Sequence, residues 1–372
     1  MGEVTTRSRK LPADRMGLDV YFDTMPELGA SDMHMKVGLP IMMRIGGTLR
    51  PLDMPEVTEE QSDALCHSIL NETQKAQLRE IGSVDVAYST PKGCRVRINV
   101  FRQRGVLSLA ARYVNATIPD FDELMLPGET LTRICRSEAG LVIVAGATGC
   151  GKSTTLAAMI DYINHTRKCH VLTLEDPIEY LFNDDKAVIN QREIGIDADS
   201  FESALKYALR EDPDVILMGE MRDEETVATG LSAAETGHLV FGTIHANSAP
   251  QTVGRVLDLF PGNRQEQVRK ALVFNIRAIV CQRLLRCTKK NRQRVPACEI
   301  MVSSAAVRKV IGEGRDQELH QVMRDAASEG MIDFTHSIYN LVQDRLVTRR
   351  EALARAPNPD ALKSLLDGLD IV

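Results

Sequence analysis

The sequence predicts an α/β protein of two domains, in which a small α+β domain precedes a larger domain that ends in a helical region. Its 372 residues exceed what a single hydrophobic core usually holds. In the second half, short apolar segments alternate with amphipathic helical segments, which is the pattern of a mainly parallel sheet with helices on its faces. Hydrophobic residues make up 44% of the chain and charged residues 26%, as in globular proteins.

The first domain is expected over residues 16–115, after a polar tail at 1–15 that we expect to be flexible. Hydrophobic residues recur at helical spacing in two segments, which are 19–29 and 55–82. Short runs rich in β-branched residues predict strands at 31–37, 41–47, 48–52, 84–90, 94–103 and 107–114. The next stretch, 116–128, contains two prolines and several acidic residues, and it is therefore predicted to be a linker.

The second domain is expected over residues 129–372. Apolar runs predict strands at 141–145, 169–174, 186–195, 215–219 and 238–243. Helical segments lie between them, at 154–164, 199–212 and 223–237. From about residue 262 to the end the periodicity is helical almost throughout, so this part is predicted to be all-helical.

The stretch GATGCGKST matches the G-x-x-x-x-G-K-[ST] pattern in full. It consists of Gly146, Ala147, Thr148, Gly149, Cys150, Gly151, Lys152, Ser153 and Thr154. Glycines let backbone N–H groups approach phosphate oxygens, Lys152 places a charge near the β- and γ-phosphates, and the Ser153 hydroxyl suits Mg²⁺. Because an apolar strand precedes the pattern and a helix follows it, the sequence predicts a nucleoside triphosphate site here.

Two acidic residues follow predicted strands of the same sheet. The segment DVILMGE resembles a Walker B strand in which Glu220 takes the carboxylate position, and Glu175 follows the strand before it. Parallel strands bring their carboxyl ends to one edge, so both acids are expected beside the phosphates. One would hold Mg²⁺ and the other would orient or deprotonate the attacking water, in an order that the pattern leaves open. A turn-capping role before Pro177 is the structural alternative for Glu175.

Histidines and arginines supply further candidates. His238 and His245 bracket the strand LVFGT, which suggests a role in sensing the γ-phosphate or in signalling between subunits. Arginines are concentrated in the first domain, on the predicted strand 94–103 and at its exit. A solvated sheet edge is one explanation for them, and contact with the phosphates of a neighbouring subunit is the other.

Charge and cysteine content exclude some classes of function. A net charge of −6 and a pI of about 5.8 argue against nucleic acid as the main partner. The eight cysteines form no C-x-x-C pair, which fits reduced thiols rather than a zinc site. No apolar run approaches the roughly 18 residues of a membrane span, so we expect a cytosolic chain that is able to dock on a membrane complex.

Six segments together resemble one family, the retraction ATPases of type IV pili (PilT and its paralogue PilU) in the secretion ATPase superfamily. They lie at 146–164, 174–180, 191–195, 208–223, 233–247 and 267–285. The resemblance covers about residues 16–350 and implies a hexameric ring of PAS-like N-terminal and RecA-like C-terminal domains that hydrolyses ATP with Mg²⁺. One departure is the family's AIRNLI segment, associated with retraction, which reads AVRKVI here at 306–311.

The resemblance also implies roles for individual residues. It places Lys152 and Ser153 in Walker A, Glu175 in an Asp box, Glu220 in an atypical Walker B that shares the metal with Ser153, and His238 and His245 in a His box. Arg97 and Arg112 fall near the N-domain arginines that reach a bound nucleotide in this family.

The implied partners are a homohexamer, an inner-membrane platform protein at the pilus base and, optionally, a paralogous motor subunit. The chain would thus lie in the cytoplasm, peripherally associated with the inner membrane. A pilus extension or secretion ATPase and a non-hydrolysing ring subunit are the alternatives. Relatives of the first kind usually carry extra N-terminal domains and often a tetracysteine zinc insert, and the intact catalytic residues disfavour the second. A DNA-packaging translocase is disfavoured by the acidic pI.

Overall fold

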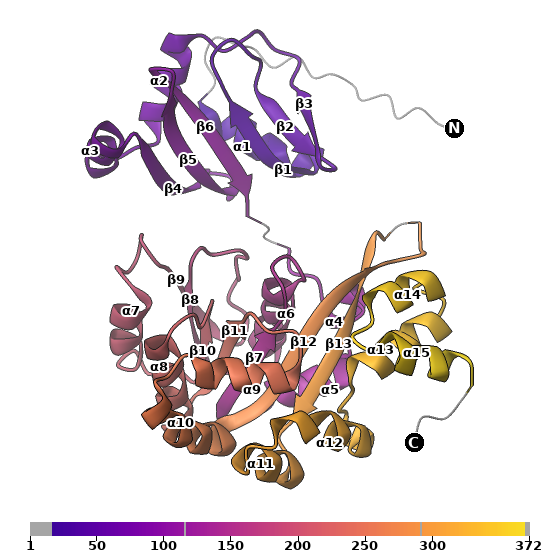
Figure 1. The fold of residues 1–372 in the computed structure, drawn as a ribbon. Coiled ribbons are helices and arrows are strands. Elements are labelled where there is room, and N and C mark those ends of the chain that lie inside the picture. Colours follow the sequence, from indigo (N-terminus) through magenta and orange to yellow (C-terminus); the bar gives the residue numbers. More distant parts are fainter. Residues whose placement is uncertain (1–16, 115–116, 291, 369–372) are drawn as a thin grey trace. The chain divides into compact units, whose positions relative to one another are not determined.

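The computed structural model describes residues 17–114, 117–290 and 292–368. The chain divides into two compact units, Met1–Ala116 and Thr117–Val372 (Figure 1). Each unit has hydrophobic clusters of its own, one in the first and two in the second. The predicted tail at 1–15 lies outside the described residues, so its flexibility stays a prediction.

The first unit is a six-stranded antiparallel sheet whose strands run in the order β3-β2-β1-β6-β5-β4, with helices packed against one face (Figure 1). Its elements are α1 (Leu18–Leu28), β1 (Ala30–Met35), β2 (Met42–Ile45), β3 (Thr48–Pro51), α2 (Glu59–Ser68), α3 (Glu72–Ile81), β4 (Ser83–Ser89), β5 (Arg95–Gln103) and β6 (Val106–Tyr113). On β5, Val96, Ile98 and Val100 are fully buried, whereas Arg97 and Asn99 between them are only partly buried. One face of the sheet therefore forms the core and the other is polar, as expected for the PAS-like α+β domain.

The segment 55–82, predicted as one amphipathic helix, contains two. Thr58 and Gln61 form a capping box at the start of α2, and Asn71 and Gln74 form another at the start of α3. Each cap satisfies backbone N–H groups that would otherwise lack partners, so a new helix begins at each.

The second unit contains a seven-stranded sheet in the order β13-β12-β7-β11-β10-β8-β9, which is parallel except for β13. Its first elements are α4 (Phe121–Leu124), α5 (Gly128–Cys135), β7 (Gly140–Ala145), α6 (Lys152–Thr166), β8 (His170–Glu175), β9 (Val188–Glu193), α7 (Phe201–Ala208), β10 (Val215–Met218), α8 (Glu224–Glu235) and β11 (Leu239–Ile244). The remaining elements are α9 (Ala249–Asp258), α10 (Gly262–Asn275), β12 (Ile276–Arg286), β13 (Arg294–Val302), α11 (Ala305–Gly312), η1 (Asp316–Glu318), α12 (Leu319–Asp325), η2 (Ala327–Glu329), α13 (Phe334–Gln343), α14 (Arg349–Arg355) and α15 (Pro359–Leu366).

This sheet has a core on each face. Along β7, Leu141 and Ile143 point into a cluster that includes residues of α7 to α15, while Val142 and Val144 point into a cluster with α5 and α6. A strand buried on both faces carries apolar residues at every position, which is why β7 is a continuous apolar run in the sequence. The RecA-like α/β domain with a helical C-terminal region is thus the observed fold.

Two predicted boundaries are corrected in this unit. The all-helical part from about 262 is interrupted by β12 and β13, which extend the sheet, and the helical region begins only at Ala305. The predicted linker at 116–128 contains α4, and its Phe121 and Leu126 are buried in the core. The acidic residues read as a linker signal, Asp120 and Glu123, form the capping box of α4.

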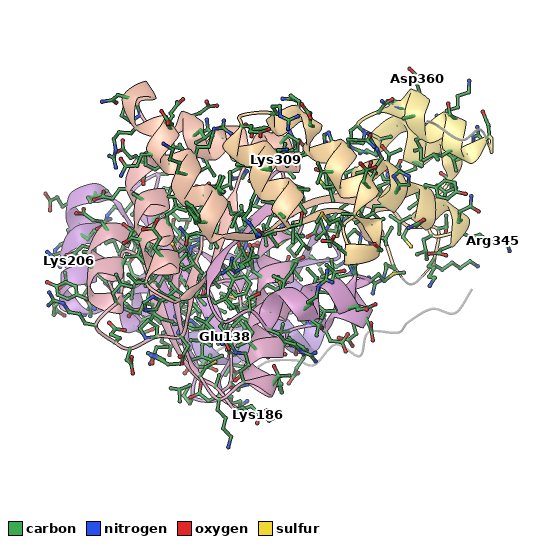
Figure 2. All side chains as sticks on the ribbon, turned by 90° about the horizontal axis from the view of Figure 1, so that it is seen from below. Glu138, Lys186, Lys206, Lys309, Arg345 and Asp360 are labelled. Atoms are coloured by element: carbon green, nitrogen blue, oxygen red, sulfur yellow. The ribbon has the colours of Figure 1, made fainter. Side chains whose placement is uncertain are left out.

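Charged side chains cover the surface of the second unit. Figure 2 labels six of them, which are all exposed: Glu138, Lys186, Lys206, Lys309, Arg345 and Asp360. Among the described residues, none of the helices combines the length and the apolar character needed to span a bilayer.

Candidate active site

The phosphate loop joins β7 to α6, as the sequence predicts. All six residues of β7 are buried, the glycine loop follows Ala145, and α6 begins at Lys152. Gly149 and Gly151 adopt positive φ angles of 75° and 96°, which favour glycine. A Cβ at Gly146 would lie 2.7 Å from the backbone carbonyl oxygen of Gln282 and 2.5 Å from Cys150 Sγ, so this position is closed to any side chain.

Hydrogen bonds fix the side chains of Lys152 and Thr154 beside the phosphate loop. Lys152 Nζ donates hydrogen bonds to the carbonyl oxygens of Gly146 and Ala147, at 3.0 and 3.2 Å. The hydroxyl of Thr154 lies 2.9 Å from that of Tyr180. The ammonium group is therefore held over the loop, where N–H groups at the start of α6 add further positive potential.

The ends of three more strands bring polar groups to the same edge of the sheet. Glu175 ends β8, Glu220 follows β10 by two residues, and His245 directly follows β11. The parallel registers of these strands align their carboxyl ends with that of β7. A cavity of about 630 Å³ lies at this edge and is lined by Thr148, Gly149, Gly151, Lys152, Ser153, Thr154, Glu175, Glu220, Arg222, His245 and Arg294, among others.

Glu220 forms a pair of polar contacts. Its Oε2 accepts from Arg222 Nη2 at 2.8 Å, and its Oε1 lies 3.1 Å from His245 Nε2. Partial burial raises the pKa of Glu220, but the hydrogen bond and charge of Arg222, with His245 and Lys152 nearby, outweigh burial and bring the pKa below its usual range. Glu220 is therefore a carboxylate at any pH near neutrality.

Glu175 is electrostatically different. Its Oε1 accepts from Thr173 Oγ1 at 2.7 Å and from Gln191 Nε2 at 3.3 Å. Desolvation nevertheless dominates and raises the pKa of Glu175 to about 7, although both hydrogen bonds lower it. Glu175 and Glu220 thus differ in how readily they bind a proton. A carboxyl group with a pKa near neutral pH has the proton affinity that a general base needs.

This difference predicts a pH-dependent effect on stability. A carboxyl whose pKa is raised in the folded state stabilises the fold fully below its unfolded pKa, and this contribution is lost as the pH rises through about 7. Glu175→Gln should therefore raise the melting temperature by several degrees relative to wild type at pH 8, and by much less at pH 5. Thermal unfolding at both pH values checks this, with Glu138→Gln, an exposed glutamate outside the cavity, as control. An equal shift at both pH values would contradict it.

The structure does not bring His238 to this cavity. His238 precedes β11, and its carbonyl accepts from the N–H of Gly140 at the start of β7, whereas the phosphate loop follows the other end of β7. Its Nδ1 lies 2.9 Å from the carbonyl oxygen of Ala233. The six-residue strand β11 separates the two histidines by roughly 20 Å. The expectation that His238 binds the nucleotide is therefore corrected for the cavity of its own subunit, whereas its role in signalling between subunits stays a prediction.

Arg97 and Arg112 belong to the first unit, where they face each other. They are directly opposite on β5 and β6, and Asp32 is the next residue across on β1. Arg112 Nε donates to Asp32 Oδ1 at 2.9 Å, and Arg44 Nε lies 3.4 Å from Asp32 Oδ2. Two guanidinium groups thus contact one carboxylate on the polar face of the sheet, and Arg97 lies across from Arg112 on the next strand, which leaves an excess of positive charge there.

Sequence reasoning missed three polar residues of the site. Arg222 pairs with Glu220, and Arg294 on β13 lines the cavity. Gln282 on β12 accepts from Thr155 Oγ1 at 2.7 Å and so fixes the first turn of α6. Arg222 could have been recognised from its position two residues after Glu220. Gln282 and Arg294 could not, because the segments that form β12 and β13 were predicted to be helical.

The residues at the cavity fit Mg²⁺. Ser153 and Glu220 supply hard oxygen ligands to the same space. No group of three or more acidic, histidine or cysteine side chains in the described part of the chain is arranged to hold a metal by itself.

Comparisons with known proteins agree with this site. The model of the family "Type II/IV secretion system protein" matches residues 27–353. The Pseudomonas aeruginosa "Type IV pilus retractation ATPase PilT" is 40% identical over 332 residues, which cover 89% of this chain and 96% of that protein. "Type IV pilus ATPase PilU" of the same organism is 36% identical over 342 residues, which cover 92% and 89%.

A solved structure, described as the "Pilus Retraction Motor PilT and Bound ADP", superposes with a TM-score of 0.87 at 43% identity and covers 94% of this chain and 99% of that chain. With its phosphate loop and strand-end carboxylates, the chain belongs to the type II/IV secretion system protein family.

Proposed function

We propose that this chain is an ATP-hydrolysing motor that powers retraction of type IV pili, and that it works as a homohexamer. The observation that carries the proposal is the convergence of a complete phosphate loop, Glu175, Glu220 and His245 on one cavity. The similarity to PilT over 89% of the chain supports pilus retraction as the work that hydrolysis drives. The chain is an ATPase.

Each side chain of the cavity has a role that follows from its chemistry. Lys152 and the loop N–H groups bind the β- and γ-phosphates, and Thr154 lies beside them. Glu175, with a pKa of about 7, accepts the proton of the attacking water, and the ionised Glu220 orients that water together with His245. Ser153 and Glu220 would hold Mg²⁺, which neutralises phosphate charge when bound.

The described residues that line this cavity supply few unpaired cations, so a cation from another subunit would add to the binding of phosphate. Arg222 is paired with Glu220, which leaves Lys152 and Arg294 as the cations without a carboxylate partner among the described lining residues. Arg97 and Arg112, in the positive cluster of the first unit, supply guanidinium groups suited to phosphate. We therefore propose that they reach the nucleotide of a neighbouring subunit in the ring.

The proposed setting is the cytoplasmic side of the inner membrane, against a platform protein at the pilus base, with a PilU-like paralogue as an optional partner. The 36% identity to PilU over 92% of the chain makes a PilU-like role the second candidate. A non-hydrolysing ring subunit is disfavoured because both carboxylates and Lys152 are in place.

Deletion of the gene tests the proposal. The deletion strain should accumulate surface pili and lose twitching motility, because pili are still built but not withdrawn. Wild type should restore both, whereas Glu220→Gln should restore neither, since losing this carboxylate lowers kcat by about 10²-fold or more. Pilus counts by electron microscopy and colony expansion are the measurements. A deletion strain without pili would indicate an extension ATPase instead.

A further inference from the structure

A buried carboxylate, Glu299 on β13, connects the loop that carries His245 to the helical end of the chain. Its side chain is 2% exposed. Its Oε1 accepts from the N–H of Ala249 at 2.7 Å, and its Oε2 accepts from the N–H of Phe334 at 3.4 Å. His320 Nε2 of α12 lies 3.5 Å from Oε2. One side chain therefore joins the first residues of α9 and α13 to α12.

The position of Glu299 suits an ionised group. The N–H groups in the first turn of a helix have no partner within the helix and carry partial positive charge. Glu299 receives such N–H groups from two helices and contacts His320 as well. Replacing its carboxylate with an amide would present an N–H₂ group to one of these donors, so neutral Gln does not reproduce the contacts.

Arg283 on β12 makes a second connection between the same parts. Its Nη2 donates to the carbonyl oxygen of Asn247 at 3.4 Å, and its Nη1 donates to that of Arg355 at 3.2 Å. Its guanidinium carbon lies 4.8 Å from the ring centroid of Phe334. The loop before α9 is thus attached to α13 and α14 through Arg283 and Glu299 together.

The loop itself is short and internally braced. Three residues separate His245 from Ala249. Ser248 caps α9 by accepting from the N–H of Gln251, and the Gln251 side chain accepts from the N–H of Asn247 at 3.2 Å. A shift at the start of α9 is therefore passed to His245, whose Nε2 lies 3.1 Å from Glu220.

We propose that Glu299 is a positioning residue for ATP hydrolysis. It holds His245 against Glu220 and makes that contact depend on the arrangement of α12, α13 and α14. A cavity of about 630 Å³ beside Glu299, lined by residues of α12, α13 and α15, gives these helices room to move. The proposal rests on the proposed function, in which His245 helps Glu220 to orient water.

A double-mutant cycle with the full chain tests this. Glu299→Gln should lower kcat by about tenfold and change the KM for ATP by less than about twofold, because the phosphate loop is untouched. His245→Ala should also lower kcat. The double variant should have the kcat of His245→Ala alone, since Glu299 acts through a residue that is no longer present. Arg283→Lys, which removes the paired contacts of the guanidinium group with Asn247 and Arg355, should show the same non-additivity if Glu299→Gln does not fold.

Asp23→Asn is the control. Asp23 is a largely buried carboxylate of the first unit, and its side chain contacts Thr90 and Lys92 rather than α9, α12 or α13. This variant should leave kcat within about twofold of wild type, both with His245 and with His245→Ala.

Two outcomes overturn the proposal in different ways. If Glu299→Gln lowers kcat equally with and without His245, or not at all, the positioning role is wrong and the proposed function stands. If His245→Ala leaves kcat unchanged, the catalytic part assigned to His245 fails as well.

Discussion

Replacing Lys152 with alanine should abolish ATP hydrolysis, with a fall in kcat of about 10³-fold or more. Two loop carbonyls hold the Lys152 ammonium where the β- and γ-phosphates would bind, so its charge acts without a cost of reorganisation during the reaction. Arg222 is paired with Glu220 and is not free to substitute for it. Phosphate release at saturating ATP is the measurement.

Lys186→Ala is the control for this variant. Lys186 is an exposed lysine of the same unit and lies outside the cavity (Figure 2). Its replacement should leave phosphate release within about twofold of wild type, as surface substitutions usually do. If Lys152→Ala retained turnover within tenfold of wild type, ATP hydrolysis at this loop would be refuted.

Removing both Arg97 and Arg112 should reduce turnover by about 10³-fold or more, the scale of an arginine supplied in trans. Activity should return in part when this double variant is mixed with Lys152→Ala subunits. A mixed ring contains interfaces that combine the intact phosphate loop of one subunit with the intact arginines of its neighbour. When equal amounts are mixed at random, half of the subunits have an intact phosphate loop and the other half have intact arginines. About a quarter of the interfaces therefore combine an intact phosphate loop with the intact arginines of the neighbour.

The mixing experiment distinguishes action on a neighbour from action within one chain. If the arginines serve their own subunit, every subunit in the mixture lacks an essential group, and the mixture stays as inactive as either parent. Arg102→Ala is the matched control, because Arg102 lies on the same strand but donates to the carbonyl of Gly105 in its own hairpin. Rings that contain this variant should turn over at the wild-type rate.

The parts of the site that the sequence predicted are the local ones. A phosphate loop requires its glycines and lysine in fixed order between a strand and a helix, so the pattern alone locates it. Glu175 and Glu220 were found because parallel strands must deliver their carboxyl ends to one edge. The same rule should have placed His238 at the opposite edge, since it precedes the strand that His245 follows.

The missed parts depend on long-range pairing. The run that forms β12 is apolar at most positions because it is buried on both faces, and such a run cannot be told from a buried helix by periodicity. Gln282, Arg283, Arg294 and Glu299 all lie on β12 or β13, so their contacts with the loop and with α9 were invisible. The two capping boxes that divide 55–82 into separate helices could have been recognised in the sequence. They were overlooked because polar residues also occur on the exposed surface of a single continuous helix.

The packing of Gly146 has a consequence for the synthesis of this protein. The space beside Gly146 is closed by the carbonyl of Gln282, and Thr155 donates to the Gln282 side chain, although more than a hundred residues separate them in the chain. Until β12 leaves the ribosome, β7 has an unpaired ladder on one side and its loop lacks this support. A nascent chain therefore completes its phosphate loop only after β12 has been synthesised, and it exposes an apolar strand edge until then.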